Sequence, residues 1–221
     1  WPVGHERRGT HSVSRTGLRV ATLSTLEWWK ARFAELKVKA GEIRDVGGGA
    51  TLVFGEGEGR CFRVRVDDAG PPANPWEKSP VPAEHQIKGL GPITLSVPDI
   101  RNTEAVLVQV MNMKETATYP NPDGEGEVHV FSMGDGGPAA ELHVAVEPDL
   151  PAAHQGAGAV HHVAFRAPDV EALHAWTERL RGFRLPSSGE VERFYFRSLY
   201  FREPNGILFE IATDGPGFAV D

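Results

Sequence analysis

The sequence predicts an α+β fold made of repeated units, in which a strand, a helix and about three further strands follow one another. Residues 95–100 (LSVPDI) match residues 165–170 (FRAPDV) at an offset of 70, which indicates an internal repeat. Apolar residues at helical spacing follow the strand, and glycine turns then separate short β-prone runs. We therefore expect repeated βαβββ modules whose sheets form half-barrels.

The first complete copy is expected at residues 13–68. Apolar side chains at helical spacing predict a helix with one buried face: Leu26, Trp29, Phe33 and Leu36. Val13 and Trp29 are 16 residues apart, as are their counterparts in the last copy, so the two copies are cognate. Glycines at residues 47–49 and 55–59 predict turns between the strands that follow the helix.

The middle of the chain is less regular. A proline-rich stretch at residues 69–88 predicts an extended linker. The second copy, at residues 89–148, is degenerate, because its helical region, residues 99–113, is rich in valine. The repeat is stronger evidence here than helix propensity, so we still expect a helix.

The last copy, expected at residues 149–221, contains the clearest helix. Asp169 is a natural N-cap, Gly182 is a stop signal, and the apolar positions between them share one face: Val170, Leu173, Trp176 and Leu180. A half-barrel leaves a sheet edge and an apolar face uncovered, so each module needs a partner. Three copies leave one unpaired, and we interpret residues 1–12 as the tail of an N-terminal module that this sequence lacks.

The composition is that of a globular protein and argues against several classes of function. The 221 residues carry a net charge of −7 and no cluster of Lys and Arg, so we expect no nucleic-acid partner. The apolar runs are too short to span a bilayer, so we expect no membrane partner. Cys61 is the single cysteine, which excludes an internal disulfide and predicts a cytoplasmic protein.

Glu210 is the most informative residue, because it is a carboxylate within an apolar strand, residues 206–212. A buried carboxylate is costly unless a cation or a metal compensates it. His162 lies in another predicted strand, residues 160–165, and alternation places each side chain on a face that could line one cleft. The pair supplies two of the three ligands of a His, His, carboxylate triad, which is typical of non-haem Fe(II) chemistry.

The repeat provides an internal control for this pair. The positions aligned with it hold other residues in the other copies: Arg15 and Arg63 in the first, Pro92 and, within one residue, Glu141 in the second. Only the last copy keeps both types of ligand. In the alternative interpretation, Glu210 pairs with Arg193 or Arg197 and His162 is an ordinary core histidine.

Other histidines are weaker candidates. His161 points to the opposite face of a regular strand from His162, so we expect it to support the site or to pack beside it rather than to bind metal. His11 and His85 are the candidates within this chain for a third ligand.

Two segments resemble a known family. Residues 158–165 (GAVHHVAF) and 193–218 resemble the ring-cleaving dioxygenases of the vicinal oxygen chelate superfamily, which also contains glyoxalases and bleomycin-resistance proteins. The nearest relatives by this resemblance are hydroquinone-type extradiol enzymes, and residues 80–85 (PVPAEH) extend the likeness to nearly the whole chain.

The resemblance implies the vicinal oxygen chelate fold of four βαβββ modules and an Fe(II) ion held by two histidines and a glutamate. It carries one histidine onto His162 and the glutamate onto Glu210, whereas the other histidine lies in a first module that this sequence lacks. Tyr200 and Arg193 match family positions near the substrate, and His161 matches the histidine beside the ligand.

The implied function is an Fe(II)-dependent, extradiol-type ring-cleaving dioxygenase that acts on hydroquinone-like aromatic substrates with O2. In this interpretation Tyr200 donates a proton or a hydrogen bond, and Arg193 stabilises anionic charge, although Tyr200 could simply pack and Arg193 could pair with Glu190 or Glu192. The alternatives are a non-catalytic protein that binds aromatic ligands and confers resistance, and a glyoxalase-like, metal-dependent isomerase. Mn, Zn or Ni are the alternative metals, and a homo-oligomer or an exchange of modules between chains could cover the open cleft.

Overall fold

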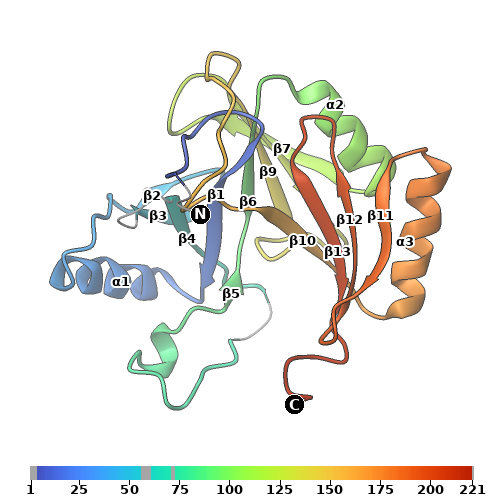
Figure 1. Ribbon diagram of the computed structural model, residues 1–221. Coiled ribbons are helices and arrows are strands. Elements are labelled where there is room, and N and C mark those ends of the chain that lie inside the picture. Colours follow the sequence, from blue (N-terminus) through green and yellow to red (C-terminus); the bar gives the residue numbers. More distant parts are fainter. Residues whose placement is uncertain (1–3, 56–60, 71–72, 221) are drawn as a thin grey trace. The chain divides into compact units, whose positions relative to one another are not determined.

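The protein was characterised as a computed structural model that describes residues 4–55, 61–70 and 73–220 (Figure 1). The chain divides into two compact units: unit 1 comprises Trp1–Ile100 and Met113–Val160, and unit 2 comprises Arg101–Asn112 and His161–Asp221. Most of the glycine turn predicted at residues 55–59 lies outside the described residues.

The first βαβββ repeat forms one half of the sheet of unit 1. Its elements are β1 (Ser12–Val20), α1 (Leu23–Glu35), β2 (Arg44–Asp45), β3 (Ala50–Gly55) and β4 (Cys61–Val66). The first and last strands, β1 and β4, are parallel neighbours, whereas β3 pairs antiparallel with β4 and with β2. This order returns the chain to its first strand and leaves the other edge of β1 open for a second module.

Helix α1 packs its apolar face against this sheet. The hydroxyl of Thr22 accepts a hydrogen bond from the Thr25 amide at 3.2 Å and caps the helix. Leu26 and Phe33 are buried as predicted, in a core with Leu52 and Val64. Leu36 is an error of the prediction: it is 54 % exposed, because the helix ends at Glu35 and Leu36 is the C-cap.

The second repeat completes the sheet of unit 1. The connecting segment carries η1 (Ala83–His85) and the short strand β5 (Gly89–Leu90), and the repeat then continues as β6 (Ile93–Val97), α2 (Ile100–Ala105), η2 (Val106–Val110), β7 (Lys114–Pro120), β8 (Glu127–Ser132) and β9 (Glu141–Val146). Its first strand, β6, pairs antiparallel with β1, which joins the repeats in the order β2-β3-β4-β1-β6-β9-β8-β7. Each half-sheet therefore covers the open edge of the other.

The third repeat forms the four-stranded sheet of unit 2. Its elements are β10 (His162–Ala167), α3 (Val170–Gly182), β11 (Ser187–Glu192), β12 (Arg197–Arg202) and β13 (Leu208–Thr213), with the strand order β10-β13-β12-β11. The carboxylate of Asp169 caps α3 by accepting the Ala172 amide at 2.7 Å, and Leu173 and Leu180 are fully buried. Val170 departs from the predicted buried face, because it occupies the first helical position and is 38 % exposed.

The valine-rich segment of the second repeat is helical, as the repeat predicted. Residues 101–112, which hold most of α2 and all of η2, cluster with unit 2. The last turn, η2, is a π-helix, and the guanidinium of Arg179 on α3 donates to the carbonyls of Val110 and Gln109 at 2.5 and 2.7 Å. A cation therefore satisfies carbonyls at the end of this helix, which is where the helix dipole favours positive charge. The predicted α+β fold of βαβββ modules is confirmed.

Candidate metal centre

Three strands of unit 2 bring a row of side chains to one face of the sheet. Glu210 on β13 pairs directly with Tyr200 on β12 and with Ala164 on β10. Directly paired residues point to the same face, and His162 reaches that face because it lies two residues before Ala164. Ala164 is small, so it leaves space beside the carboxylate of Glu210.

The side chains of His162, Glu210 and Tyr200 are in direct contact. The Nε2 atom of His162 lies 2.8 Å from Oε2 of Glu210, and the Tyr200 hydroxyl donates to Oε1 of Glu210 at 2.6 Å. The carboxylate is buried, with 5 % of its side chain exposed, whereas the His162 side chain is 35 % exposed. The imidazole and the half-buried phenol of Tyr200 therefore form the accessible side of the cluster around the buried carboxylate.

The arginines proposed as alternative partners for Glu210 have other contacts. Arg197 forms an ion pair with Glu192, Nε to Oε2 at 2.8 Å. The guanidinium of Arg193 lies over the ring of Tyr200, 5.3 Å from its centroid, and the side chain is exposed. Glu210 is thus compensated by an imidazole and a phenol, which favours the interpretation as a ligand pair over that of an arginine salt bridge.

His161 touches His162, although it lies just outside strand β10. Their Nδ1 atoms are 3.0 Å apart, so one nitrogen donates and the other accepts. When Nδ1 of His162 carries the proton, Nε2 presents its lone pair toward Glu210. This contact can therefore select the tautomer that a metal-binding imidazole needs.

The donors fit a first-row divalent metal in type, but two protein ligands are fewer than a facial triad requires. Within the part of the chain that the structure describes, no group of three His, Cys, Asp or Glu side chains could hold a metal ion. His11 and His85 belong to unit 1, where His11 contacts the Thr10 hydroxyl at 2.8 Å and His85 stacks on Trp28. Both nevertheless stay candidates by residue type alone.

Strand register corrects one alignment between the repeats. Glu210 pairs with the residue two positions after His162, and Arg63 likewise pairs with Gly17, two positions after Arg15. In the second repeat, Thr94 lies two positions after Pro92 and pairs with His143, so the counterpart of Glu210 is His143 rather than Glu141. The prediction was wrong because it applied a constant sequence offset, whereas the turns between the strands differ in length from one repeat to another.

Comparisons with known proteins agree with this architecture. Residues 89–211 match the family model "Glyoxalase/Bleomycin resistance protein/Dioxygenase superfamily". The chain is 42 % identical over 214 residues to the "Putative ring-cleaving dioxygenase MhqA" of Bacillus subtilis, covering 96 % of this chain and 67 % of that protein. It is 28 % identical to the "Chlorohydroquinone/hydroquinone 1,2-dioxygenase" of Sphingobium indicum, covering 94 % of this chain and 64 % of the relative.

A solved structure is similar over nearly the whole chain. The crystal structure of a "putative dioxygenase" from Bacillus subtilis superposes with a TM-score of 0.86 at 27 % identity, covering 99 % of this chain and 67 % of that one. The chain thus spans about two thirds of the length of these relatives. In the part of the chain that the structure describes, no helix combines the length and the apolar character needed to cross a membrane.

Proposed function

Because the chain belongs to the glyoxalase/bleomycin resistance protein/dioxygenase superfamily, we propose that it carries part of the active site of a metal-dependent, ring-cleaving dioxygenase. The observation that carries the proposal is the contact of His162, Tyr200 and Glu210 on one face of the sheet of unit 2. Two relatives are named putative ring-cleaving dioxygenases, and a third is named a chlorohydroquinone/hydroquinone 1,2-dioxygenase. These names support the proposed class of reaction.

His162 and Glu210 would hold the metal through Nε2 and a carboxylate oxygen. Fe(II) is the metal we propose, with Mn, Zn or Ni as alternatives, and when bound it supplies the redox chemistry toward O2 that protein side chains lack. The 2.8 Å contact between the two ligand atoms requires a proton between them when no cation is present. Metal binding at Nε2 would displace that proton, to solvent or to Nδ1 of His162.

Tyr200 is proposed to position Glu210 and to move a proton. Its hydroxyl donates to Oε1 of Glu210, which orients the carboxylate and leaves Oε2 on the side of His162. The phenol has a single proton, which it can turn from Glu210 to an oxygen of the substrate, and this would be general acid catalysis. His161 is proposed to support the tautomer of His162 through its Nδ1 contact.

Arg193 is proposed to bind negative charge on the substrate or the product. It is exposed, and its guanidinium stacks on the ring of Tyr200, so it can reach an anionic group that lies above the phenol. We propose a hydroquinone as the class of substrate, because a relative that aligns with 94 % of this chain is named for that substrate. We also propose a cytoplasmic location, which the single cysteine favours.

Metal content and oxygen consumption test the proposal. The chain would be loaded with Fe(II) under anaerobic conditions, desalted and then mixed with hydroquinone and O2. We expect bound iron and oxygen uptake that both fall by about tenfold or more in His162→Ala, which removes the imidazole, and in Glu210→Gln, which replaces an anionic carboxylate with a neutral amide.

A matched control and a second reactant sharpen this test. Glu192→Gln removes an exposed carboxylate of the same sheet, which pairs with Arg197, and should change neither quantity. Oxygen uptake that survives both ligand substitutions would contradict the proposal. Turnover of a glyoxalase-type substrate without oxygen uptake would indicate the isomerase instead, and ligand binding unchanged by Glu210→Gln without turnover would indicate a binding protein.

A further inference from the structure

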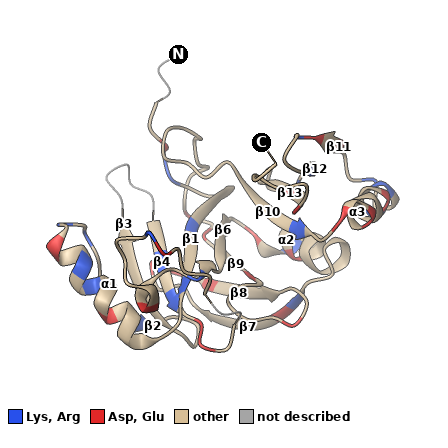
Figure 2. Cartoon of the chain, turned by 90° about the horizontal axis from the view of Figure 1, so that it is seen from below, with Lys and Arg blue, Asp and Glu red and all other residues tan. Residues whose placement is uncertain are grey.

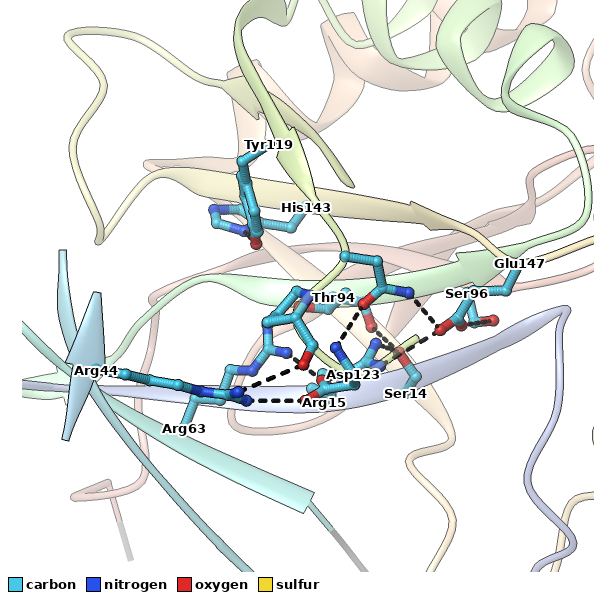
Figure 3. A network of polar contacts seen from close by, with 12 residues as sticks. Ser14, Arg15, Arg44, Arg63, Thr94, Ser96, Tyr119, Asp123, His143 and Glu147 are labelled. Carbon is cyan, nitrogen blue, oxygen red and sulfur yellow. Dashed lines mark hydrogen bonds and ion pairs between the residues drawn. The ribbon is translucent and has the colours of Figure 1, made fainter. Parts of the chain in front are cut away.

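A small cavity in unit 1 lies at the positions that correspond to the metal ligands of unit 2. Its volume is about 20 Å³, which is room for one water molecule or one small ion. The polar part of its lining comes from five strands and consists of Thr51, Arg63, Arg65, Thr94, Tyr119 and His143. Figure 3 shows Arg63 and Thr94 below Tyr119 and His143 in this region.

Arg63 and Arg65 line this cavity, and each has a buried Nε–H without a hydrogen-bond partner among the described residues. Arg63 is 7 % exposed, and its Nη2 atom donates to Asp123 at 2.5 Å. An unpaired N–H on a buried charged group costs free energy comparable to a strong hydrogen bond. A donor of this kind can bind an acceptor such as a water molecule or an anion.

The surrounding charges leave a surplus of positive charge. Arg15, Arg44 and Arg63 share Asp123, Arg15 also contacts Glu147 at 3.4 Å, and Arg65 lies 3.9 Å from Glu141. Four guanidinium groups therefore face three carboxylates, and none of the nine described residues that line the cavity is acidic. Figure 2 shows Lys and Arg within the neighbouring strands β1 and β4, the positions of Arg15, Arg19, Arg63 and Arg65.

At neutral pH the charges around the cavity stay as counted, four positive guanidinium groups and three negative carboxylates. Burial opposes ionisation of Asp123 and Glu147, but arginine charge and hydrogen bonds outweigh it and hold both pKa values below their ordinary range. The hydrogen bond from His143 likewise lowers the pKa of Glu141. Burial lowers the pKa of His143, so its imidazole stays neutral, and burial raises the pKa of Tyr119, so its phenol stays protonated.

The polar hydrogens of Tyr119 and His143 are already committed. Nε2 of His143 lies 3.1 Å from Glu141, and Nδ1 lies 2.9 Å from the Tyr119 hydroxyl. Glu141 is an acceptor when ionised, so Nε2 donates to it and Nδ1 accepts the phenolic proton. The positive charge and the two unpaired Nε–H donors thus come from Arg63 and Arg65, the arginines of β4 that line the cavity.

We propose that this cavity binds one halide-sized anion, held by the Nε–H of Arg63 and by the positive charge of Arg65. Arg63 is the counterpart of Glu210 by strand register, so unit 1 carries a guanidinium where unit 2 carries a carboxylate. In this proposal, the cavity of unit 1 binds an anion, whereas the corresponding candidate metal centre of unit 2 binds a cation. The anion site uses residues of unit 1 alone and does not depend on the proposed catalysis.

Bromide is the probe, because its anomalous scattering identifies it in crystals. Crystals of the 221-residue chain grown in sodium bromide should show an anomalous peak within hydrogen-bond distance of Arg63 Nε. A cavity that holds water only, or that shows bromide only at molar concentration, would overturn the proposal. This measurement uses the unmodified chain, so it does not depend on how a variant folds.

Arg63→Lys tests the donor itself, because the lysine Cε occupies the place of Nε and the charge toward Asp123 is kept. The matched control is Arg44→Lys, which makes the same change at an exposed arginine that also contacts Asp123 but does not line the cavity. The readout is the bromide-dependent rise in the midpoint of thermal unfolding, with ionic strength kept constant by sodium gluconate.

We expect bromide to bind about tenfold more weakly to Arg63→Lys, the loss of one charge-assisted hydrogen bond, and as tightly to Arg44→Lys as to the unmodified chain. An equal rise in all three proteins would contradict a site at Arg63 and would assign the effect to screening or to surface sites.

Discussion

The hydroxyl of Tyr200 donates a 2.6 Å hydrogen bond to the carboxylate of Glu210, and the two residues are direct partners on the neighbouring strands β12 and β13. The same carboxylate reaches His162 through its other oxygen at 2.8 Å. Glu210 is therefore held between a hydrogen-bond donor of fixed position and a more accessible imidazole. This arrangement explains how a carboxylate persists within an apolar strand, and it provides an oriented oxygen for a cation.

Tyr200→Phe should lower both stability and turnover. It removes a hydrogen bond to a buried carboxylate, so we expect the free energy of unfolding to fall by about 2 kcal/mol. We expect kcat to fall by about a hundredfold in oxygen-uptake assays, which is typical for the loss of a positioned proton donor. Tyr195→Phe is the control, because it keeps the ring that stacks on Phe218 and should leave kcat unchanged. An unaltered kcat in Tyr200→Phe would remove this residue from the proposed mechanism.

Arg193→Met should affect substrate binding more than folding. The side chain is exposed and contacts the ring of Tyr200 as a cation–π pair, which contributes up to about 1 kcal/mol at such sites. Denaturant unfolding should therefore change little, whereas KM for hydroquinone should rise by about tenfold, the loss of one charged contact. Arg197→Met removes a nearby exposed arginine that pairs with Glu192, and a similar rise in KM there would argue against a specific role for Arg193.

Glu203→Ala should be strongly destabilising for a reason unrelated to the proposed catalysis. Glu203 is 2 % exposed, and it accepts hydrogen bonds from Thr103, Asn205 and the Ile207 amide at 2.9, 3.2 and 3.1 Å. The substitution leaves these donors without their acceptor, so we expect a loss of about 3 kcal/mol in urea unfolding. Thr103→Val removes one of the donors and should cost about 1 kcal/mol. A loss in Glu203→Ala no larger than in Thr103→Val would contradict this account.

Acid should destabilise the chain in two stages. His143 has a lowered pKa in the folded state, so below its ordinary value of 6.5 the unfolded chain takes up a proton that the folded chain does not. Asp123, Glu141 and Glu147 also have lowered pKa values, so their stabilisation is complete above the ordinary values of 3.8 and 4.5 and is lost as the pH falls through the folded values.

The free energy of unfolding, followed from pH 7 downward, should therefore start to fall near 6.5 and fall again below 4.5. His143→Gln should remove the first stage and keep the second. A pH profile of this variant with an undiminished first stage would show that another group is responsible.

The local features of the fold could be predicted because they depend on neighbours in the sequence. The N-cap at Asp169 and the buried positions Leu173 and Leu180 follow from the period of a helix. The exposure of a helix end depends on what packs against it and not on the local sequence. For this reason the prediction that Leu36 and Val170, apolar residues at helix ends, are buried was wrong. The helix of residues 99–113 was correct because the repeat outweighed its poor propensity.

Part of the candidate site could likewise be predicted from the sequence, and part required the structure. The alternation of side chains in a strand led to His162 and Glu210, because the spacing within each strand determines which side chains share a face. The partners across strands could be identified only from the strand register, which placed Tyr200 opposite Glu210. The register also showed that the counterpart of Glu210 in the second repeat is His143 and not Glu141.

The sequence by itself therefore determined the repeated βαβββ units and led to His162 and Glu210 as the proposed ligand pair, since periodicity and residue type are local. Only the tertiary structure decided that Tyr200 holds Glu210 and that Arg63, which lines a cavity, has a buried Nε–H without a hydrogen-bond partner among the described residues. Those contacts join residues far apart in the chain, and their geometry depends on how strands are paired and on what surrounds each buried charge.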